Sequence, residues 1–190
     1  MGRKGCFQGR SRTENSLKGR EEPSSRKQPP CSRRLADAHL VGVISDTHGL
    51  IRPGISKIFK GVDMIIHAGD IGSPEVLASL QQVAPVIAVR GNVDKGQWSR
   101  ELCETQFIEV KHLSLYVLHD LKELDLNPAA AGFRAVISGH SHRPSIEERN
   151  GVLYVNPGSA GPRRLKLPVP VALLHIQHNA LDAQLIELEP

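Results

Sequence analysis

The chain has 190 residues, of which 39% are hydrophobic and 4% aromatic. This length and composition favour a single domain with one substantial core. No stretch approaches the roughly 20 apolar residues that a membrane helix needs, and the first thirty residues lack the apolar core of a signal peptide. We therefore expect a cytoplasmic protein that does not associate with a membrane.

The formal net charge of +4 is unevenly distributed. Residues 1–35 contain ten Lys or Arg and three Glu, so they carry +7, whereas the rest of the chain carries −3. This segment has scarcely any apolar periodicity and cannot bury enough surface to offset the entropy of ordering. We predict a disordered basic extension over 1–35 and one folded domain over 36–190. Phe7 is the only aromatic residue of the extension, so sequence-specific nucleic-acid binding is not expected.

The cysteines do not form a recognisable motif. Cys6, Cys31 and Cys103 are odd in number and show no C-x-x-C spacing. Two of them lie in the predicted extension. We expect reduced thiols without a catalytic role.

The first half of the folded region alternates between strands and helices. Apolar runs at 40–44, 64–67 and 86–89 predict strands. Pro53 marks the first turn of one helix, and Ser73-Pro74-Glu75 is a typical start of another. Such alternation implies right-handed crossovers and a largely parallel sheet.

The second half consists mainly of short strands. The expected strands are 107–110, 113–118, 135–137, 145–148, 152–155, 169–175 and 181–188, with one helix near 127–131. Asn150-Gly151 between two apolar runs predicts a hairpin, because a type I′ turn needs positive φ at both central residues. Two sheets stacked face to face, with helices outside, fit this pattern best.

Polar side chains follow five of the predicted strands. In an open α/β sheet, ligands gather outside the carboxyl ends of the strands. The candidate ligands are Asp46, His48, Asp70, Asn92, His119, His140 and His142. Seven ligands are too many for one tetrahedral zinc, which takes about four, but they suit two ions that share one ligand. Asp70 is the predicted bridge, because the preceding Gly69 allows close approach.

This mixture of carboxylate, imidazole and amide ligands suits divalent ions. Manganese is the ion we expect, with nickel, iron and zinc as alternatives that affinity alone does not separate. Two such ions can activate a water nucleophile and neutralise charge on a phosphoryl group during in-line attack. The predicted chemistry is therefore hydrolysis of a phosphate ester.

Several motifs together carry a resemblance to a known family. They are Ser45-Asp46-Thr47-His48, His67-Ala68-Gly69-Asp70, Arg90-Gly91-Asn92-Val93-Asp94, His119, Gly139-His140-Ser141-His142 and Asn156-Pro157-Gly158-Ser159. From Leu40 to the C-terminus the chain resembles the calcineurin-like metallophosphoesterases, in particular the small single-domain YfcE-type phosphodiesterases of bacteria and archaea. The resemblance implies an α/β fold, namely a four-layer αββα sandwich of two mixed β-sheets flanked by helices. It also implies a metal-dependent phosphoesterase, with a phosphodiesterase as the favoured activity.

The resemblance also divides the ligands between two ions. One ion would be held by Asp46, His48, Asp70 and His142, and the other by Asp70, Asn92, His119 and His140. Asp70 and Asn92 would serve in catalysis, with Asn92 also touching the substrate phosphate.

Two residues depart from the family pattern. Val93 stands where the wider superfamily often has a histidine thought to protonate the leaving group, and valine cannot transfer a proton. Substrates with stable leaving groups should therefore be favoured. Asp120 stands where the family often has glycine, and its side chain could narrow access or disturb the surroundings of the ligands.

Alternatives to a phosphodiesterase remain open. The same chemistry permits a phosphomonoesterase that acts on small metabolites. A second class is a protein-binding scaffold, since the retromer scaffold subunit has this fold with an altered metal site. Acceptable residues at all seven ligand positions favour the enzyme over the scaffold. The predicted partner is a small phosphodiester or phosphomonoester substrate, and a homo-oligomer is left open.

Some conspicuous residues are given structural roles instead. His67 lies inside a predicted buried strand and is expected to be a hydrogen-bonded core residue. Trp98 and Phe107 are expected to pack in the core or a lid. Arg143, Arg163 and Arg164 are more often solvated than bound to phosphate, although guanidinium groups match phosphate oxygens well.

Overall fold

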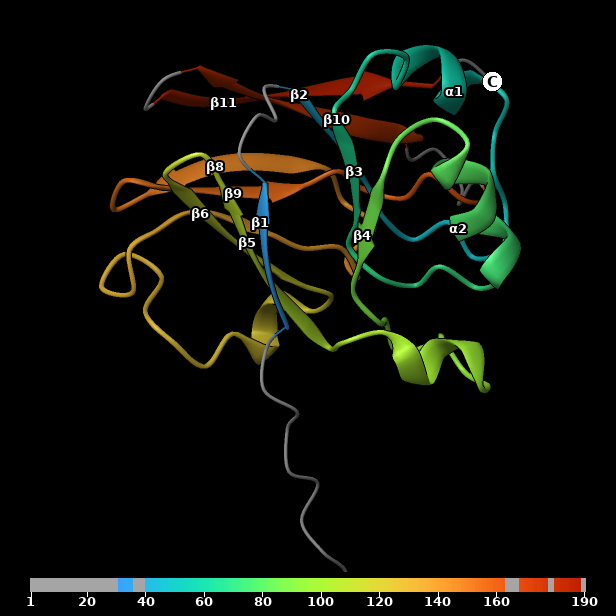
Figure 1. Ribbon diagram of the computed structural model, residues 1–190, viewed down its shortest axis with the longest axis horizontal. Helices are drawn as coiled ribbons and strands as arrows, with labels where there is room; N and C mark the ends of the chain where they lie inside the picture. The colour runs from blue at the N-terminus through green and yellow to red at the C-terminus, as the bar shows by residue number, and fades with distance from the viewer. Residues whose placement is uncertain (1–30, 36–39, 163–167, 178–179, 189–190) are drawn as a thin grey trace, which may run out of the picture.

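The computed structural model describes residues 31–35, 40–162, 168–177 and 180–188, with the backbone alone for 31–35. Two mixed β-sheets of six and five strands lie face to face (Figure 1). The predicted sandwich of two mixed sheets is therefore confirmed. Within the described ranges, no helix is long and apolar enough to cross a membrane.

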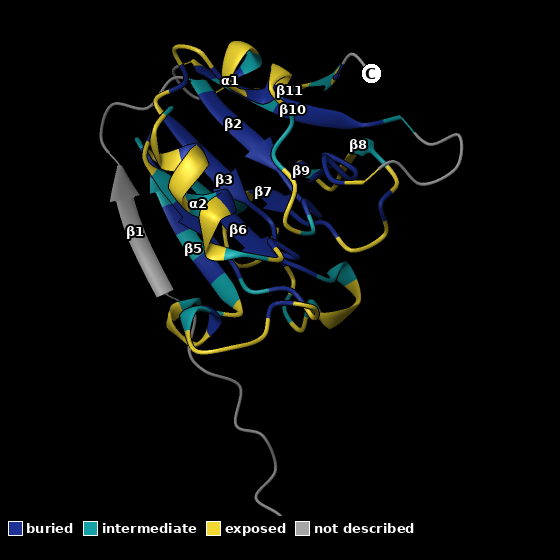
Figure 2. Cartoon of the chain, turned by 90° about the vertical axis from the view of Figure 1, so that its right-hand side faces the viewer, coloured by how far each residue is buried: buried dark blue, intermediate teal, exposed yellow. Residues whose placement is uncertain are grey.

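The five-stranded sheet has the order β11-β10-β2-β3-β4. Its parallel part comprises β2 (Leu40–Ile44), β3 (Met64–His67) and β4 (Val86–Ala88). The antiparallel strands β10 (Pro170–Gln177) and β11 (Ala180–Glu187) extend it beyond β2. Helices α1 (Gly54–Ile58) and α2 (Pro74–Gln81) connect the parallel strands and cover the outer face of this sheet (Figures 1 and 2).

The six-stranded sheet has the order β1-β5-β6-β7-β9-β8. Its strands are β1 (Cys31–Leu35), β5 (Thr105–Val110), β6 (Leu113–Leu118), β7 (Phe133–Ile137), β8 (Ser145–Arg149) and β9 (Val152–Asn156). A short 3₁₀ helix, η1 (Trp98–Glu101), lies on the connection from the other sheet. Asn150 and Gly151 have φ of 53° and 75°, so the predicted β8–β9 hairpin is confirmed.

The main core fills the space between the sheets. Alternate residues of each strand point to one face, so Val41 and Val43 enter this core from β2, and Leu115 and Val117 meet them from β6. All four side chains are fully buried, and β2 is coloured mostly as buried in Figure 2. A second cluster lies between the five-stranded sheet and the helices. The central strands are therefore apolar on both faces, which explains their continuous apolar runs.

The outermost layer over the six-stranded sheet is not an α-helix. A 3₁₀ helix, η2 (Leu121–Glu123), and the following loop pack Leu124 and Leu126 against that sheet. The helix predicted near 127–131 is wrong, because residues 128–132 form turns. Ala131 N donates to Asn127 O as in a single helical turn, but Gly132 has a φ of 80° and ends it at once.

Two further expectations change at the start and middle of the chain. Cys31–Leu35, the last five residues of the predicted extension, form β1 and pair in parallel with β5. Residues 1–30 lie outside the described part, so the domain boundaries stay a prediction.

Cys103 is disulfide-bonded, so the expectation of a reduced thiol is wrong for this residue. Cysteine pairing depends on proximity in space, which spacing in the sequence does not reveal.

Gly42 of β2 provides a test of the packing between sheet and helix. A Cβ atom here would lie 2.9 Å from the ring of Phe59, which is fully buried at the end of α1. We expect Gly42→Ala to lower the free energy of unfolding by about 1–3 kcal/mol. In Gly54→Ala the new methyl group would meet Leu188 at an ordinary 3.5 Å, so this variant is the matched control. Equal unfolding midpoints for both variants in denaturant would contradict the packing argument.

Candidate metal centre

The predicted ligands come together where strands of both sheets end. Asp46 and His48 follow β2, Asp70 follows β3 and Asn92 follows β4. His119 follows β6, and His140 and His142 follow β7. Backbone hydrogen bonds tie these loops together, including Asp46 N to Gly69 O and Gly139 N to His119 O, both 3.0 Å. The centre therefore spans the junction of the two sheets.

Five of the seven predicted ligands have left-handed backbone conformations. In the described part of the chain, positive φ occurs at seven non-glycine residues, and five of these are Asp46, His48, Asp70, His140 and His142, with φ between 47° and 66°. This region disfavours residues with a Cβ atom and costs roughly 1–2 kcal/mol per residue. Such conformations persist where the surrounding structure imposes them, and they cluster at functional sites.

Three side chains form the first group. Nε2 of His142 lies 3.2 Å from Oδ1 of Asp46, and Nε2 of His48 lies 4.0 Å from the same oxygen. The two imidazole nitrogens are 3.4 Å apart, and the rings are stacked with centroids separated by 5.2 Å. One carboxylate oxygen and two imidazole nitrogens thus point toward a common point.

Four side chains form the second group. Nε2 of His119 lies 3.3 Å from Oδ1 of Asp70 and 3.2 Å from Oδ1 of Asn92. Nδ1 of His140 lies 3.0 Å from the same Asn92 oxygen. Asp70 and His119 are buried, whereas Asn92 and His140 are exposed. This group therefore has one open side, which a substrate could approach.

Asp46 is a buried carboxylate with unusual surroundings. Its Oδ2 accepts hydrogen bonds from Ser45 Oγ at 2.5 Å and from His140 N at 3.1 Å. Its Oδ1 is buried and accepts no hydrogen bond. Burial raises the pKa of Asp46, because the charged form loses its hydration. A cation beside Oδ1 would compensate for that loss, so this residue fits a metal site.

His119 is oriented so that one ring nitrogen faces the centre. Its Nδ1 lies 2.8 Å from the carbonyl oxygen of Ala68, where an N–H group donates. The neutral ring would then present the Nε2 lone pair toward Asp70 and Asn92, as metal-bound histidines commonly do. Burial opposes the charged ring, but in that form Nε2 donates to Asp70 and Nδ1 to Ala68 O, and these hydrogen bonds raise the pKa of His119 overall.

The pKa of Asp70 shifts in the opposite direction to that of Asp46. Burial alone would raise it, but hydrogen bonds from His119 and from Val93 N, the latter at 3.0 Å, lower it below the ordinary value. Asp70 is thus held as an anion. In each of two sets of three residues, the ligand atoms all lie within 4.8 Å of one another. Both sets contain Asp46: one adds His48 and His142, and the other adds Asp70 and His119. The donor set fits divalent ions, while bridging by Asp70 stays a prediction.

Glycines make room for these side chains. A Cβ atom on Gly91 would lie 2.1 Å from the backbone nitrogen and Oδ1 of Asp70. On Gly69, with a φ of 90°, it would lie 2.6 Å from Nδ1 of His119. The His119 ring therefore packs directly against the backbone of Gly69, while the role expected for this glycine in bridging by Asp70 stays a prediction.

Two further motif residues, Asp94 and Asn156, support the loops that carry the ligands. The carboxylate of Asp94 accepts from Gly72 N and Gly91 N, both at 2.8 Å, and so joins the loops after β3 and β4. Nδ2 of Asn156 donates to Gly139 O at 2.7 Å and to Ser141 Oγ at 3.1 Å, which fixes the loop that carries His140 and His142. Both residues stand within the sequence motifs, which marks them as candidates. Their hydrogen-bond partners belong to other loops and could be identified only from the structure.

The residues given structural roles fall largely as expected. Nε2 of His67 lies 2.9 Å from Thr47 Oγ1, and burial lowers the pKa of His67 to about 3, so it is a neutral core residue. Val93 is 40% exposed beside the centre and offers no titratable group. Arg143 is exposed, and Arg163 and Arg164 lie outside the described residues.

Asp120 lies against the ligand His140. Its Oδ2 is 3.5 Å from Nε2 of His140, and its Oδ1 accepts from Lys122 N at 3.0 Å. Because Nδ1 of His140 faces Asn92, the carboxylate approaches the opposite side of the ring. The side chain expected to disturb the ligand surroundings is therefore placed to orient the ring.

Comparison with known proteins agrees with this geometry. The family model "Calcineurin-like phosphoesterase superfamily domain" matches residues 40–179. A probable metallophosphoesterase of Methanothermobacter thermautotrophicus is 35% identical over 159 residues, which cover 77% of this chain and 91% of that protein. A phosphodiesterase of Methanocaldococcus jannaschii is 30% identical over 137 residues, which cover 62% of this chain and 82% of that protein.

Solved structures show the same fold. The crystal structure of Vps29 from Chaetomium thermophilum superposes with a TM-score of 0.69 and 20% identity, covering 80% of this chain and 88% of that one. At this identity the likeness speaks for the fold alone. The family match, by contrast, extends over most of the folded region and includes all seven candidate ligands. The chain therefore belongs to the calcineurin-like phosphoesterase superfamily.

Proposed function

We propose that the chain is a phosphodiesterase that uses two divalent ions, with manganese as the expected metal. The observation that carries this proposal is that the buried Asp46 belongs to two sets of closely spaced ligand atoms, one with His48 and His142 and the other with Asp70 and His119. The relatives named metallophosphoesterase and phosphodiesterase support the reaction class. When bound, the two ions supply an activated water nucleophile and neutralise charge on the phosphoryl oxygens.

The protein's own residues would position the substrate. Asn92 is exposed at the open side of the centre, and its Oδ1 faces His119 and His140. Its amide nitrogen would donate a hydrogen bond to a non-bridging phosphate oxygen. A cavity of about 330 Å³ lies at this side and is lined by Asn92, His119 and His140. The phosphate would therefore bind in this cavity.

Val93 restricts the leaving group. It stands beside Asn92 and cannot protonate a departing alkoxide. Its backbone nitrogen instead donates to Asp70 Oδ1, which holds that carboxylate in place. Diesters whose leaving groups are stable as anions would be the favoured substrates.

Turnover of bis(p-nitrophenyl) phosphate by metal-stripped protein tests the proposal. We expect activity when Mn²⁺ is added and a loss of about 100-fold or more in Asp70→Asn, because this carboxylate would hold the ions. Asp182→Asn, an exposed substitution on β11, is the matched control and should leave the rate unchanged. Faster turnover of the monoester p-nitrophenyl phosphate would favour a phosphomonoesterase. Folded protein that is inactive with Mn²⁺, Ni²⁺, Fe²⁺ and Zn²⁺ would refute hydrolysis and favour a scaffold.

Calorimetric titration with Mn²⁺ tests the ligand groups without relying on activity. We expect two ions per chain in the unmodified protein and one in His142→Ala, since this substitution removes a ligand of the first group only. His112→Ala, an exposed histidine on the β5–β6 turn, should retain both ions. A comparison of Asp46→Asn with Asp70→Asn identifies the shared carboxylate, because its loss should abolish both binding events. Two ions in His142→Ala, or a single ion in the unmodified protein, would contradict this assignment.

A further inference from the structure

A second cavity adjoins the proposed phosphate position. Its volume is about 480 Å³, and it shares His140 and Asp120 with the cavity over Asn92. These two residues thus form a common wall between the two spaces. A group attached to a phosphate at Asn92 could pass this wall and enter the second cavity, whose size suits a small organic group.

The β8–β9 hairpin builds most of this second cavity. Side chains alternate along a strand, so Ser145, Glu147 and Arg149 of β8 share one face. In the register of the hairpin, Tyr154 of β9 lies opposite Glu147. Ile146, between the pocket residues, packs against the core between the sheets. The strand is thus apolar inward and polar toward the cavity.

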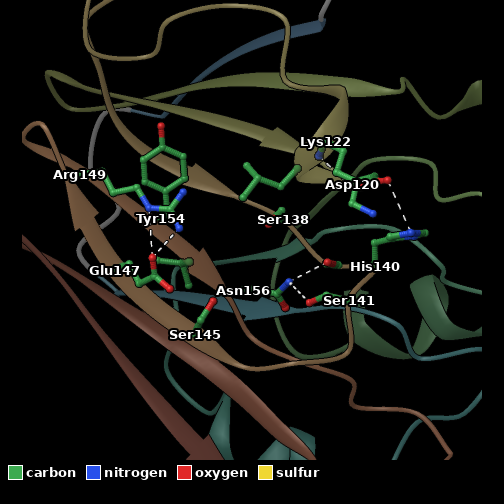
Figure 3. A pocket seen from close by; sticks show the side chains of 13 residues that line it. Asp120, Lys122, Ser138, His140, Ser141, Ser145, Glu147, Arg149, Tyr154 and Asn156 are labelled. Atoms are coloured by element: carbon green, nitrogen blue, oxygen red, sulfur yellow. Dashed lines mark hydrogen bonds and ion pairs between the residues drawn. The ribbon is translucent and has the colours of Figure 1, made fainter.

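Arg149 and Tyr154 form a stacked pair in this wall. The guanidinium carbon lies 4.9 Å from the centroid of the Tyr154 ring. Nε and Nη2 of Arg149 both donate to Oε2 of Glu147, at 3.1 and 2.5 Å, which fixes the guanidinium group (Figure 3). The Arg149 side chain is 54% exposed, so it is accessible on the side away from the tyrosine. A fixed guanidinium plane is well suited to stack on a further flat π-system.

We propose that the second cavity binds a planar aromatic group on the ester arm that stays attached to phosphorus, either a nucleobase or a substituted phenyl ring, against the Arg149–Tyr154 stack. This inference rests on the phosphodiesterase function proposed above and adds the substrate class. Glu147 already balances the charge of Arg149, so a second phosphate is a poorer match than an uncharged ring. Figure 3 shows the stack and the His140–Asp120 pair on opposite sides of the cavity. A substrate would therefore extend from the metal centre to the hairpin.

Unsymmetrical diesters test the substrate class. Each would carry p-nitrophenol as the leaving group, and the other arm would be methyl, phenyl or thymidine. We expect KM to be about tenfold lower for the phenyl and thymidine esters than for the methyl ester, since stacking is worth about that much per ring. A lower KM for both esters indicates recognition of a flat ring, and a lower KM for thymidine alone indicates that the nucleobase edge is also read. Equal KM values for all three would overturn the proposal.

Substitutions test whether the KM preference for aromatic arms arises from the β8–β9 hairpin. Arg149→Ala should bring the KM values of the phenyl and thymidine esters to that of the methyl ester. Arg134→Ala removes the same charge from an exposed position on β7 outside the cavity, so it should keep the preference. A preference that survives in Arg149→Ala would show that the ring binds elsewhere.

Binding measurements separate this inference from the proposed function. Calorimetry would compare thymidine 5′-monophosphate with ribose 5-phosphate, using the full chain with and without Mn²⁺. Tighter binding of the nucleotide that depends on Arg149, in a protein that hydrolyses none of the diesters, would support the cavity and refute the enzyme. Turnover of the diesters without any preference among the arms would support the enzyme and refute the cavity.

Discussion

The buried carboxylate of Asp46 is the constraint on which the centre depends. Its Oδ2 accepts from Ser45 in its own loop and from the backbone nitrogen of His140, in the loop after β7 of the other sheet. Its carbonyl oxygen accepts from Ser159 Oγ and Gly161 N, at 2.9 and 3.1 Å. One residue therefore joins the loops after β2, β7 and β9. Its remaining oxygen is directed at the imidazoles of the first group.

This arrangement requires conformations that the chain would otherwise avoid. Five ligands have left-handed backbones, each at a cost of roughly 1–2 kcal/mol. Hydrogen bonds between loops, such as His48 N to Asp70 O at 3.0 Å, and core packing on both sheets offset this conformational free energy. The protein's own contacts thus hold the ligand loops, which would reduce the entropy lost when an ion or a substrate binds.

The sequence predicts the strands of the described part well, because each is an apolar run with a clear end. The bounds of β2, β3 and β6 agree residue by residue with the predicted ranges. The strand β1 was not predicted, since pairing at a sheet edge depends on backbone hydrogen bonds and leaves little trace in a polar segment. The helix near 127–131 failed because Pro128 and Gly132 leave room for a single turn. The ligands could be identified by their positions at strand ends, whereas the central place of Asp46 depends on contacts between the sheets.

The position of the centre at the junction of the sheets has a mechanical consequence. Asp46 and His48 follow a strand of one sheet, and His142 follows a strand of the other. An ion bound by all three residues would link the two layers at their edge. Because such an ion would bind only the folded protein, it would stabilise the fold. Sliding of one layer over the other would then have to break coordinate bonds as well as hydrophobic contacts. Ions bound there for the proposed reaction would also hold the two layers together, and the free energy of unfolding would then depend on the metal concentration.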